Sequence, residues 1–166
     1  MQSQHIKLSP EIVAGLSDLA FLEETLAVIE ARENFWKYRQ YITKNLKEGW
    51  WQREVARELQ QFVDDLIAGK KPILVLSSPP QHGKSIQIID LITWMIGRYP
   101  SLKTIFASFS DRLGVRANLR IKRIVDSEKY KKIFPDLHLP NLTDKGYTNN
   151  RDLIEFLGEE GSFRNT

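Results

Sequence analysis

Residues 83–85 place a glycine before a lysine and a serine, an order of residue types that can bind phosphate. In a phosphate-binding loop, backbone N–H groups surround the anion, the lysine reaches the β- and γ-phosphates, and the next hydroxyl binds Mg²⁺. Ser78 stands where such a loop usually begins with glycine. The alternative is an ordinary turn with a solvated lysine. The candidate loop consists of Ser78, Pro79, Pro80, Gln81, His82, Gly83, Lys84 and Ser85.

The segments around this loop favour the phosphate-binding interpretation. Residues 73–76 form a short apolar run between turn residues, which is typical of a strand buried on both faces. Residues 84–96 continue as an apolar helix that ends at Gly97. A second strand over 104–109 and a helix over 111–126 follow. This order predicts an α/β fold with a parallel sheet, of the phosphate-loop NTPase type.

The first 69 residues are predicted to form a separate helical segment. Ser9, Pro10 and Glu11 combine a cap, a first-turn proline and an early acid, which indicates the start of a helix. Apolar residues at helical spacing continue this first helix to Ala20, and a second helical stripe runs from Leu22 to Ile42. A third helix is predicted from about Trp50 to Ala68. We therefore expect two parts, an N-terminal helical segment (1–69) and a partial ATPase core (70–166). The core ends in a hairpin over residues 152–164.

Four arginines recur at intervals of four, four and three in the helix predicted over 111–126, so they share one face. In a parallel α/β sheet, helices begin near the ligand crevice. Arg116, one turn into the helix, is therefore predicted to act on a γ-phosphate, within its own subunit or across an interface. Arg112, Arg120 and Arg123 are predicted to contact DNA or a neighbouring subunit. A merely solvated face is the alternative.

A complete hydrolytic site is missing from the sequence. ATP hydrolysis requires an acidic residue after a second apolar strand for Mg²⁺ and a carboxylate that orients water. No apolar run after residue 85 ends in two acidic residues, and Asp64 and Asp65 belong to a predicted helix before the loop. We therefore expect that the isolated chain binds ATP without turning it over. ATPase activity of this chain is left open.

Composition and charge exclude several other classes of protein. The chain has no cysteine, so it has no disulfide framework and no thiol nucleophile. With 42% hydrophobic and 27% charged residues it is typical of soluble globular domains. The first residues lack the pattern of a signal peptide, and no apolar run is long enough to cross a membrane. Net charge is only +3, yet residues 98–132 contain ten basic and three acidic residues, which indicates a basic surface.

Several spaced motifs resemble the ATPase domain of tailed-bacteriophage terminase large subunits, the motors that pump DNA into procapsids. The resemblance spans roughly residues 50–166. It ends where the family would continue into its acidic Walker B strand, so the chain is interpreted as an N-terminal part of such a protein. The motifs are the loop from Ser77 to Ser85, Trp94, Gly97-Arg98-Tyr99-Pro100, the segment from Ile105 to Asp111 with the arginine helix after it, and Ile133-Phe134-Pro135.

The resemblance implies ATP and Mg²⁺ as cofactors and viral genome packaging as the function. It implies double-stranded DNA, a terminase small subunit and a portal protein as partners, a homo-oligomeric ring, and the host cytoplasm as the location. Lys84 would be catalytic and Ser85 would bind the metal. In the family an upstream glutamine contacts adenine, for which Gln52 is the best candidate, before Gln60 and Gln61. Gln81 stands where the family commonly has a loop arginine.

Two other functions are compatible with the same residues. One is a DNA- or partner-binding module that keeps the loop without hydrolysing ATP. The other is an unrelated phosphate-loop NTPase, such as a helicase-type domain. Nucleotide binding that depends on Lys84 would separate the binding module from the NTPases. DNA binding that depends on the arginines would argue against a small-molecule kinase.

Overall fold

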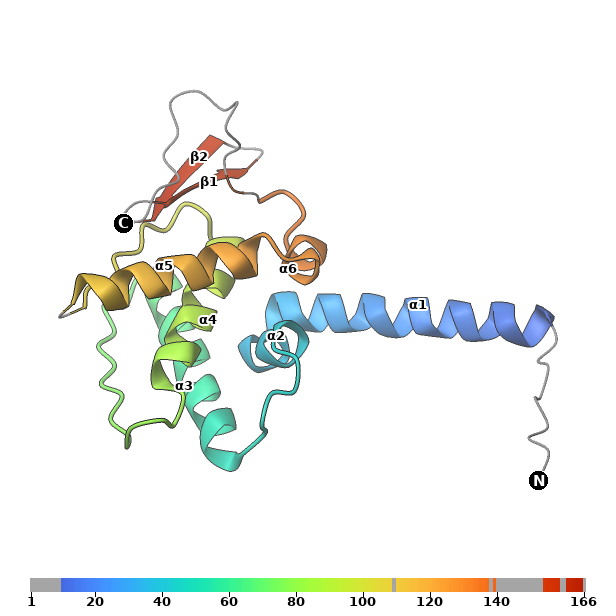
Figure 1. Cartoon of the computed structure of the whole chain (residues 1–166), viewed down its shortest axis with the longest axis horizontal. Helices are drawn as coiled ribbons and strands as arrows, with labels where there is room; N and C mark the ends of the chain where they lie inside the picture. The colour runs from blue at the N-terminus through green and yellow to red at the C-terminus, as the bar shows by residue number, and fades with distance from the viewer. Residues whose placement is uncertain (1–9, 109, 138, 140–153, 159–160, 166) are drawn as a thin grey trace.

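The structure is a computed structural model in which six helices precede a two-stranded hairpin (Figure 1). It describes residues 10–108, 110–137, 139, 154–158 and 161–165, with side chains from residue 18 to residue 139 in those ranges. Phe109, part of the second predicted strand, lies outside the described residues. The helices are α1 (Pro10–Glu33), α2 (Phe35–Ile42), α3 (Trp50–Ile67), α4 (Lys84–Arg98), α5 (Asp111–Val125) and α6 (Glu128–Ile133), and the strands are β1 (Ile154–Gly158) and β2 (Gly161–Asn165).

The prediction of a parallel α/β sheet is wrong. Within the described residues the only strands are β1 and β2, an antiparallel pair in which Phe156 lies opposite Phe163. The expected strand at 73–76 is extended but has no partner strand, and Ile73 and Val75 are 92% and 84% exposed. Ile105 in the second expected strand is 79% exposed. An apolar run becomes a buried strand only when neighbouring strands pair with it, and helices form the core here instead.

Helix α4 is the centre of the core. Every residue from Ile89 to Ile96 is buried, and α4 contacts α2, α3 and α5. A helix that is apolar on all sides is stable only when other elements cover it. The core also includes Phe35 and Tyr38 of α2 and Tyr130 of α6, so it draws on both sides of the boundary predicted at residue 70.

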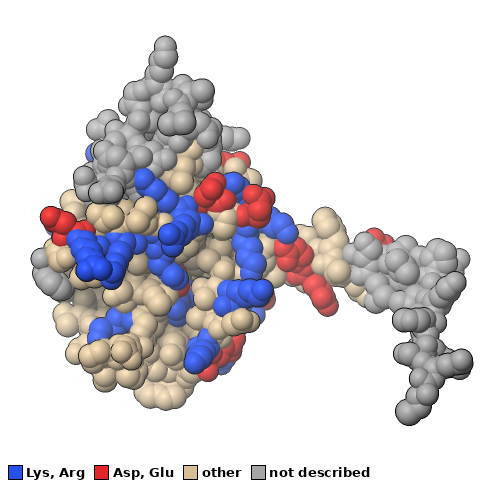
Figure 2. Space-filling view, in the orientation of Figure 1, with Lys and Arg blue, Asp and Glu red and all other residues tan. Residues whose placement is uncertain are grey.

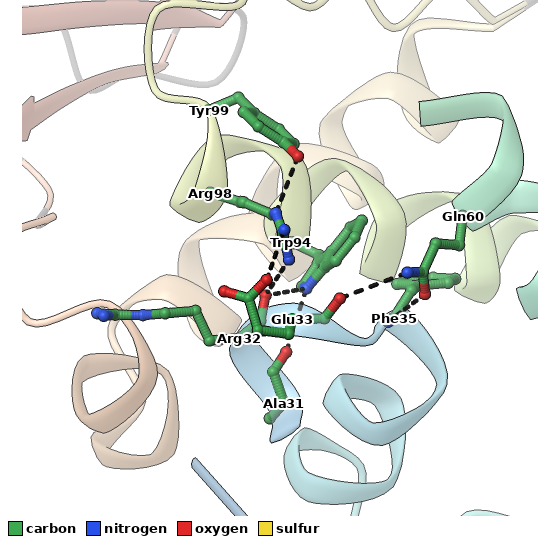
Figure 3. A network of polar contacts seen from close by, with 8 residues as sticks. All are labelled: Ala31, Arg32, Glu33, Phe35, Gln60, Trp94, Arg98 and Tyr99. Carbon is green, nitrogen blue, oxygen red and sulfur yellow. Dashed lines mark hydrogen bonds and ion pairs between the residues drawn. The ribbon is translucent and has the colours of Figure 1, made fainter. Parts of the chain in front are cut away.

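The last turn of α1 is held by two residues of α4 (Figure 3). Trp94 Nε1 donates to the carbonyls of Ala31 and Arg32 at 3.1 and 3.2 Å. Arg98 Nη1 also donates to the Arg32 carbonyl at 2.9 Å, and Arg98 pairs with Glu33 at 2.6 Å. Because the last carbonyls of a helix have no partner within it, these bonds anchor α1 by its C-terminal turn. The other end of α1 extends away from the core (Figure 1).

Most helix boundaries agree with the sequence, and the differences have local causes. The first two predicted helical stretches change over at a different residue. Helix α1 continues through Leu22 to Glu33, and the break lies at Asn34, whose side chain accepts a bond from the Lys37 amide and starts α2. The short helix α6 was not predicted. It starts at Ser127, whose hydroxyl accepts from the Tyr130 amide at 3.3 Å. In the described part of the chain, no helix has the length and apolar character needed to span a membrane.

Candidate functional site

The predicted phosphate-binding loop turns sharply before α4. Gln81 and Gly83 both have left-handed backbone conformations, with φ of 64° and 78°. Glycine adopts this backbone conformation without strain, whereas a residue with a side chain, such as Gln81, rarely does. Gly83 is also the N-cap of α4, and no side chain caps the helix. The first amides of α4 are therefore uncapped at the point where the loop meets the helix.

Lys84 reaches back across this loop. Its Nζ donates to the carbonyl of Ser78 and, at 3.3 Å, to that of Pro79. Lys84 is only partly exposed, whereas Pro79, Pro80 and most of the loop around it are exposed. An ammonium group with no carboxylate partner, held only by neutral carbonyl oxygens, can transfer its hydrogen bonds to a phosphate oxygen.

His82 stabilises the loop and connects it to α3. Its Nδ1 lies 2.9 Å from the Pro80 carbonyl, so Nδ1 carries the proton and donates. The ring of Trp51 meets that of His82 edge-on, with centroids 6.0 Å apart. The N-terminal end of α3 is thereby placed beside the loop.

Ser85, the predicted Mg²⁺ ligand, is exposed in the first turn of α4. Among the described residues no group of three or more histidine, cysteine, aspartate or glutamate side chains could hold a metal ion. A divalent cation at Ser85 would therefore take most of its ligands from the phosphates and water, which is the usual arrangement for Mg²⁺ bound with a nucleotide.

The three glutamines proposed for adenine have different surroundings. Gln52 follows Trp51 in α3, and its side chain folds over Gly49, where any Cβ would collide with its Oε1. Gln60 of α3 binds the junction between α1 and α2. Its Oε1 accepts from the Phe35 amide at 2.9 Å, and its Nε2 donates to the Glu33 carbonyl at 3.4 Å (Figure 3). Gln61 donates to Asp65 at 3.1 Å. Only Gln52 lies at the end of α3 that faces the loop.

The arginine helix is confirmed, but its four arginines differ. Arg112, Arg116 and Arg123 are exposed, and no ion pair of theirs occurs in the part of the chain that the structure describes. Arg120 instead pairs with Asp90 at 3.4 Å. Basic side chains gather over α5 in Figure 2. Arg116 was predicted to lie near a nucleotide because helices that follow the strands of a parallel sheet begin near the ligand crevice. The described residues form no such sheet, so the catalytic role of Arg116 stays a prediction.

A buried ion pair on α4 was not predicted. Asp90 accepts from Arg39 Nε at 3.1 Å, and their side chains are only 1% and 3% exposed. Burial lowers the pKa of Arg39, although Asp90 opposes this effect. With Arg120, this pair joins α2, α4 and α5. The sequence shows Asp90 as the single carboxylate in the apolar run from Ile86 to Ile96. It does not show the partners of Asp90, because Arg39 and Arg120 lie 51 and 30 residues away in the sequence.

Gln87 is a second polar residue in the interior of α4. It is fully buried, and neither its Nε2 nor its Oε1 has a hydrogen-bond partner. Arg39 Nη1 and Arg120 Nε are buried without partners as well. Unpaired buried polar atoms destabilise a fold, so this part of the core is not optimised for stability.

Comparisons with known proteins give no relative. A scan against protein-family models, a search of curated proteins and a search of solved structures each found no match. The function is therefore argued from the loop and from the charged surfaces of the chain itself.

Proposed function

We propose that the loop from Ser78 to Ser85 binds the phosphates of ATP together with Mg²⁺. The observation that carries this proposal is the position of Lys84 Nζ, which spans the loop to the carbonyls of Ser78 and Pro79. The left-handed Gly83 and the uncapped first turn of α4 add free backbone donors beside it. A cation next to such donors suits a polyanion.

Each residue has a distinct role in this proposal. Lys84 exchanges its carbonyl contacts for oxygens of the β- and γ-phosphates, and the first amides of α4 bind the same anion. The Ser85 hydroxyl supplies one ligand to Mg²⁺. Gln52 contacts the adenine, which is supported by the contact of its neighbour Trp51 with His82 in the loop. The remaining loop residues, Pro79, Pro80 and Gln81, fix the backbone around the phosphates.

In its full context, the proposed role is the ATP-binding part of a terminase-type motor that moves double-stranded DNA into procapsids. Its proposed partners are DNA, a small subunit, a portal protein and further copies in a ring, in the host cytoplasm. The support is the set of terminase-like motifs together with the loop conformation. Arg116 would act on the nucleotide of a neighbouring copy in this assembly.

The isolated chain is expected to bind ATP without measurable steady-state hydrolysis. Asp90 is the carboxylate nearest to Lys84 along α4, and it is committed to Arg39 and Arg120 in the interior. No carboxylate is thus assigned to orient water. A phosphate-release assay on the pure chain checks this expectation. Robust turnover that disappears in Lys84→Ala would show that a further acidic residue completes the site.

Titration calorimetry with ATP, ADP and AMP in the presence of Mg²⁺ tests the binding proposal. Because the loop is proposed to hold the β- and γ-phosphates, we expect affinity to fall from ATP to ADP to AMP. Lys71→Ala is the matched control, since Lys71 is an exposed lysine of the same extended segment. Lys71→Ala should keep this order, and Lys84→Ala should abolish it. Equal affinities for ATP and AMP in the unmodified chain would refute the proposal.

A second candidate function, a DNA-binding module, is favoured by α5. Arg112, Arg116 and Arg123 project from one exposed face, and the described residues offer them no ion pair. Each phosphate contact releases counterions, so the logarithm of DNA affinity falls linearly with that of the salt concentration. Arg112→Ala or Arg123→Ala should each reduce that slope by about one. A slope that does not change would exclude α5 from the DNA contact.

A further inference from the structure

An apolar stripe runs along α1 from its free half to Ile29, and no other element of the described residues covers it. All residues from Asp18 to Leu26 are exposed. Leu19, Leu22, Leu26 and Ile29 recur at intervals of three, four and three, and each is 55–61% exposed. This spacing is the seam of a helix that packs lengthwise against another helix. Glu24 lies on the opposite side of α1, where it pairs with Lys132 of α6 at 2.7 Å.

The charges beside this stripe determine which helix can cover it. Asp18 borders the stripe on one side, and Glu23 and Glu30 border it on the other. Residues 18–33 contain five acidic side chains and one basic side chain. Two copies of α1 packed on one another would bring like charges together, which disfavours the pairing. The stripe therefore requires a basic helix.

Helix α5 has the complementary pattern. Its outward face carries Arg112, Arg116, Leu119 and Arg123, and Leu119 is 43% exposed. The helix contains five basic side chains and one acidic side chain. Its spacing matches that of α1. Leu26 lies three residues after Glu23 and four before Glu30, and Leu119 lies three residues after Arg116 and four before Arg123. In each helix those charges are separated by seven residues, about 10.5 Å along the axis.

We propose that the apolar stripe of α1 docks on the outward face of α5 in a second copy of this chain. Because the charges lie on the same side of the leucine in both helices, they face each other only when the two helices run antiparallel. Leu26 then packs on Leu119, and Glu23 pairs with Arg123. The contact forms between copies because the free half of α1 extends away from α5 of its own chain (Figure 1). Such an arm-to-neighbour contact uses two different surfaces, so it builds rings or open chains of copies.

The contacts that each surface already makes allow this docking. Trp94 and Arg98 hold the last turn of α1 and keep the arm in place. Glu30 keeps its pair with Lys37 at 2.9 Å, and Arg120 keeps its pair with Asp90, so neither is used. Arg116 is not used either, so the proposal does not depend on nucleotide binding.

Sedimentation velocity of the full 166-residue chain, without nucleotide or DNA, tests the proposal. We expect concentration-dependent association at low ionic strength that weakens as salt is added. Glu23→Arg and Arg123→Glu should each weaken association about tenfold or more, and the two together should restore it to within about threefold, because the swapped pair interacts again. Lys47→Glu makes the same charge change at an exposed lysine outside both surfaces and should leave association unchanged.

Leu26→Asn is an independent variant that removes apolar contact without changing charge, and it should also weaken association. Circular dichroism of every variant verifies that the helices are intact. A chain that stays monomeric at low ionic strength would overturn the proposal. So would a charge swap that fails to restore association, or association that Arg123→Glu leaves unchanged, the result expected if α1 pairs with α1.

Discussion

The first turn and the middle of α4 carry opposite kinds of charged residue. At the first turn, partly exposed Lys84 is held only by the neutral carbonyls of Ser78 and Pro79 in an exposed loop. Six residues later, Asp90 is 1% exposed and lies between Arg39 and Arg120. Because a buried charge must be paired, Asp90 joins helices, whereas the charge of Lys84 is available to a ligand. The difference lies in how far each charged side chain is buried and in whether it has a charged partner. A buried, paired charge such as Asp90 holds helices together, whereas a partly exposed charge without a carboxylate partner can bind a ligand.

The largest expected effect is in the buried middle of α4. Asp90→Asn leaves the guanidinium of Arg39 in the interior without a counter-charge, and we expect a loss of about 3–5 kcal/mol in the free energy of unfolding. Urea unfolding followed by circular dichroism measures it. Asp65→Asn is the matched control, because Asp65 pairs with Lys70 at the surface. It should cost less than about 1 kcal/mol. Equal losses in the two variants would refute the distinction between the charges.

Trp94→Phe tests the attachment of α1 to the buried part of α4. The change removes the Nε1 donor from the carbonyls of Ala31 and Arg32. The Arg32 carbonyl keeps Arg98, but that of Ala31 loses its partner, and we expect about 1–3 kcal/mol of destabilisation. Hydrogen exchange should show faster opening of the last turn of α1 than of α3. Unchanged exchange in α1 would show that Arg98 alone anchors it.

Gln87→Met should act in the opposite direction. The amide of Gln87 is buried with both polar atoms unpaired, and methionine has a similar shape without that amide. We expect the free energy of unfolding to rise by about 1 kcal/mol. Thermal and urea unfolding check this result. A loss of stability would mean that the amide has a hydrogen-bond partner in solution, such as a buried water.

Local features of the fold were predictable, whereas long-range pairing was not. The start of α1 at Pro10, the whole of α3 and the start of α4 at Lys84 follow from caps and from apolar spacing, which are properties of neighbouring residues. The strand expected at 73–76 was wrong, because an apolar run does not specify whether strands will pair with it. The ion pair of Asp90 was missed for the same reason, since its partners are distant in the sequence.

The same distinction applies to the candidate site. Gly83, Lys84 and Ser85 were identified from adjacent residues, and their loop and helix start were found as expected. The contact of Trp51 with His82 could not be predicted, because it joins helix α3 to a loop 31 residues later. The arginine face of α5 was predicted from its spacing, but the inward pairing of Arg120 with Asp90 depends on tertiary packing.

The most direct test of the account measures ATP affinity and the free energy of unfolding on one preparation of Lys84→Ala. The account predicts that ATP binding weakens about tenfold or more, since the lysine ammonium is the one loop cation proposed to meet the phosphates. The free energy of unfolding should change by less than about 0.5 kcal/mol, because the described contacts of the Lys84 ammonium are with the loop carbonyls of Ser78 and Pro79. Unchanged ATP affinity in a folded Lys84→Ala chain would contradict the assignment of this loop to phosphate binding.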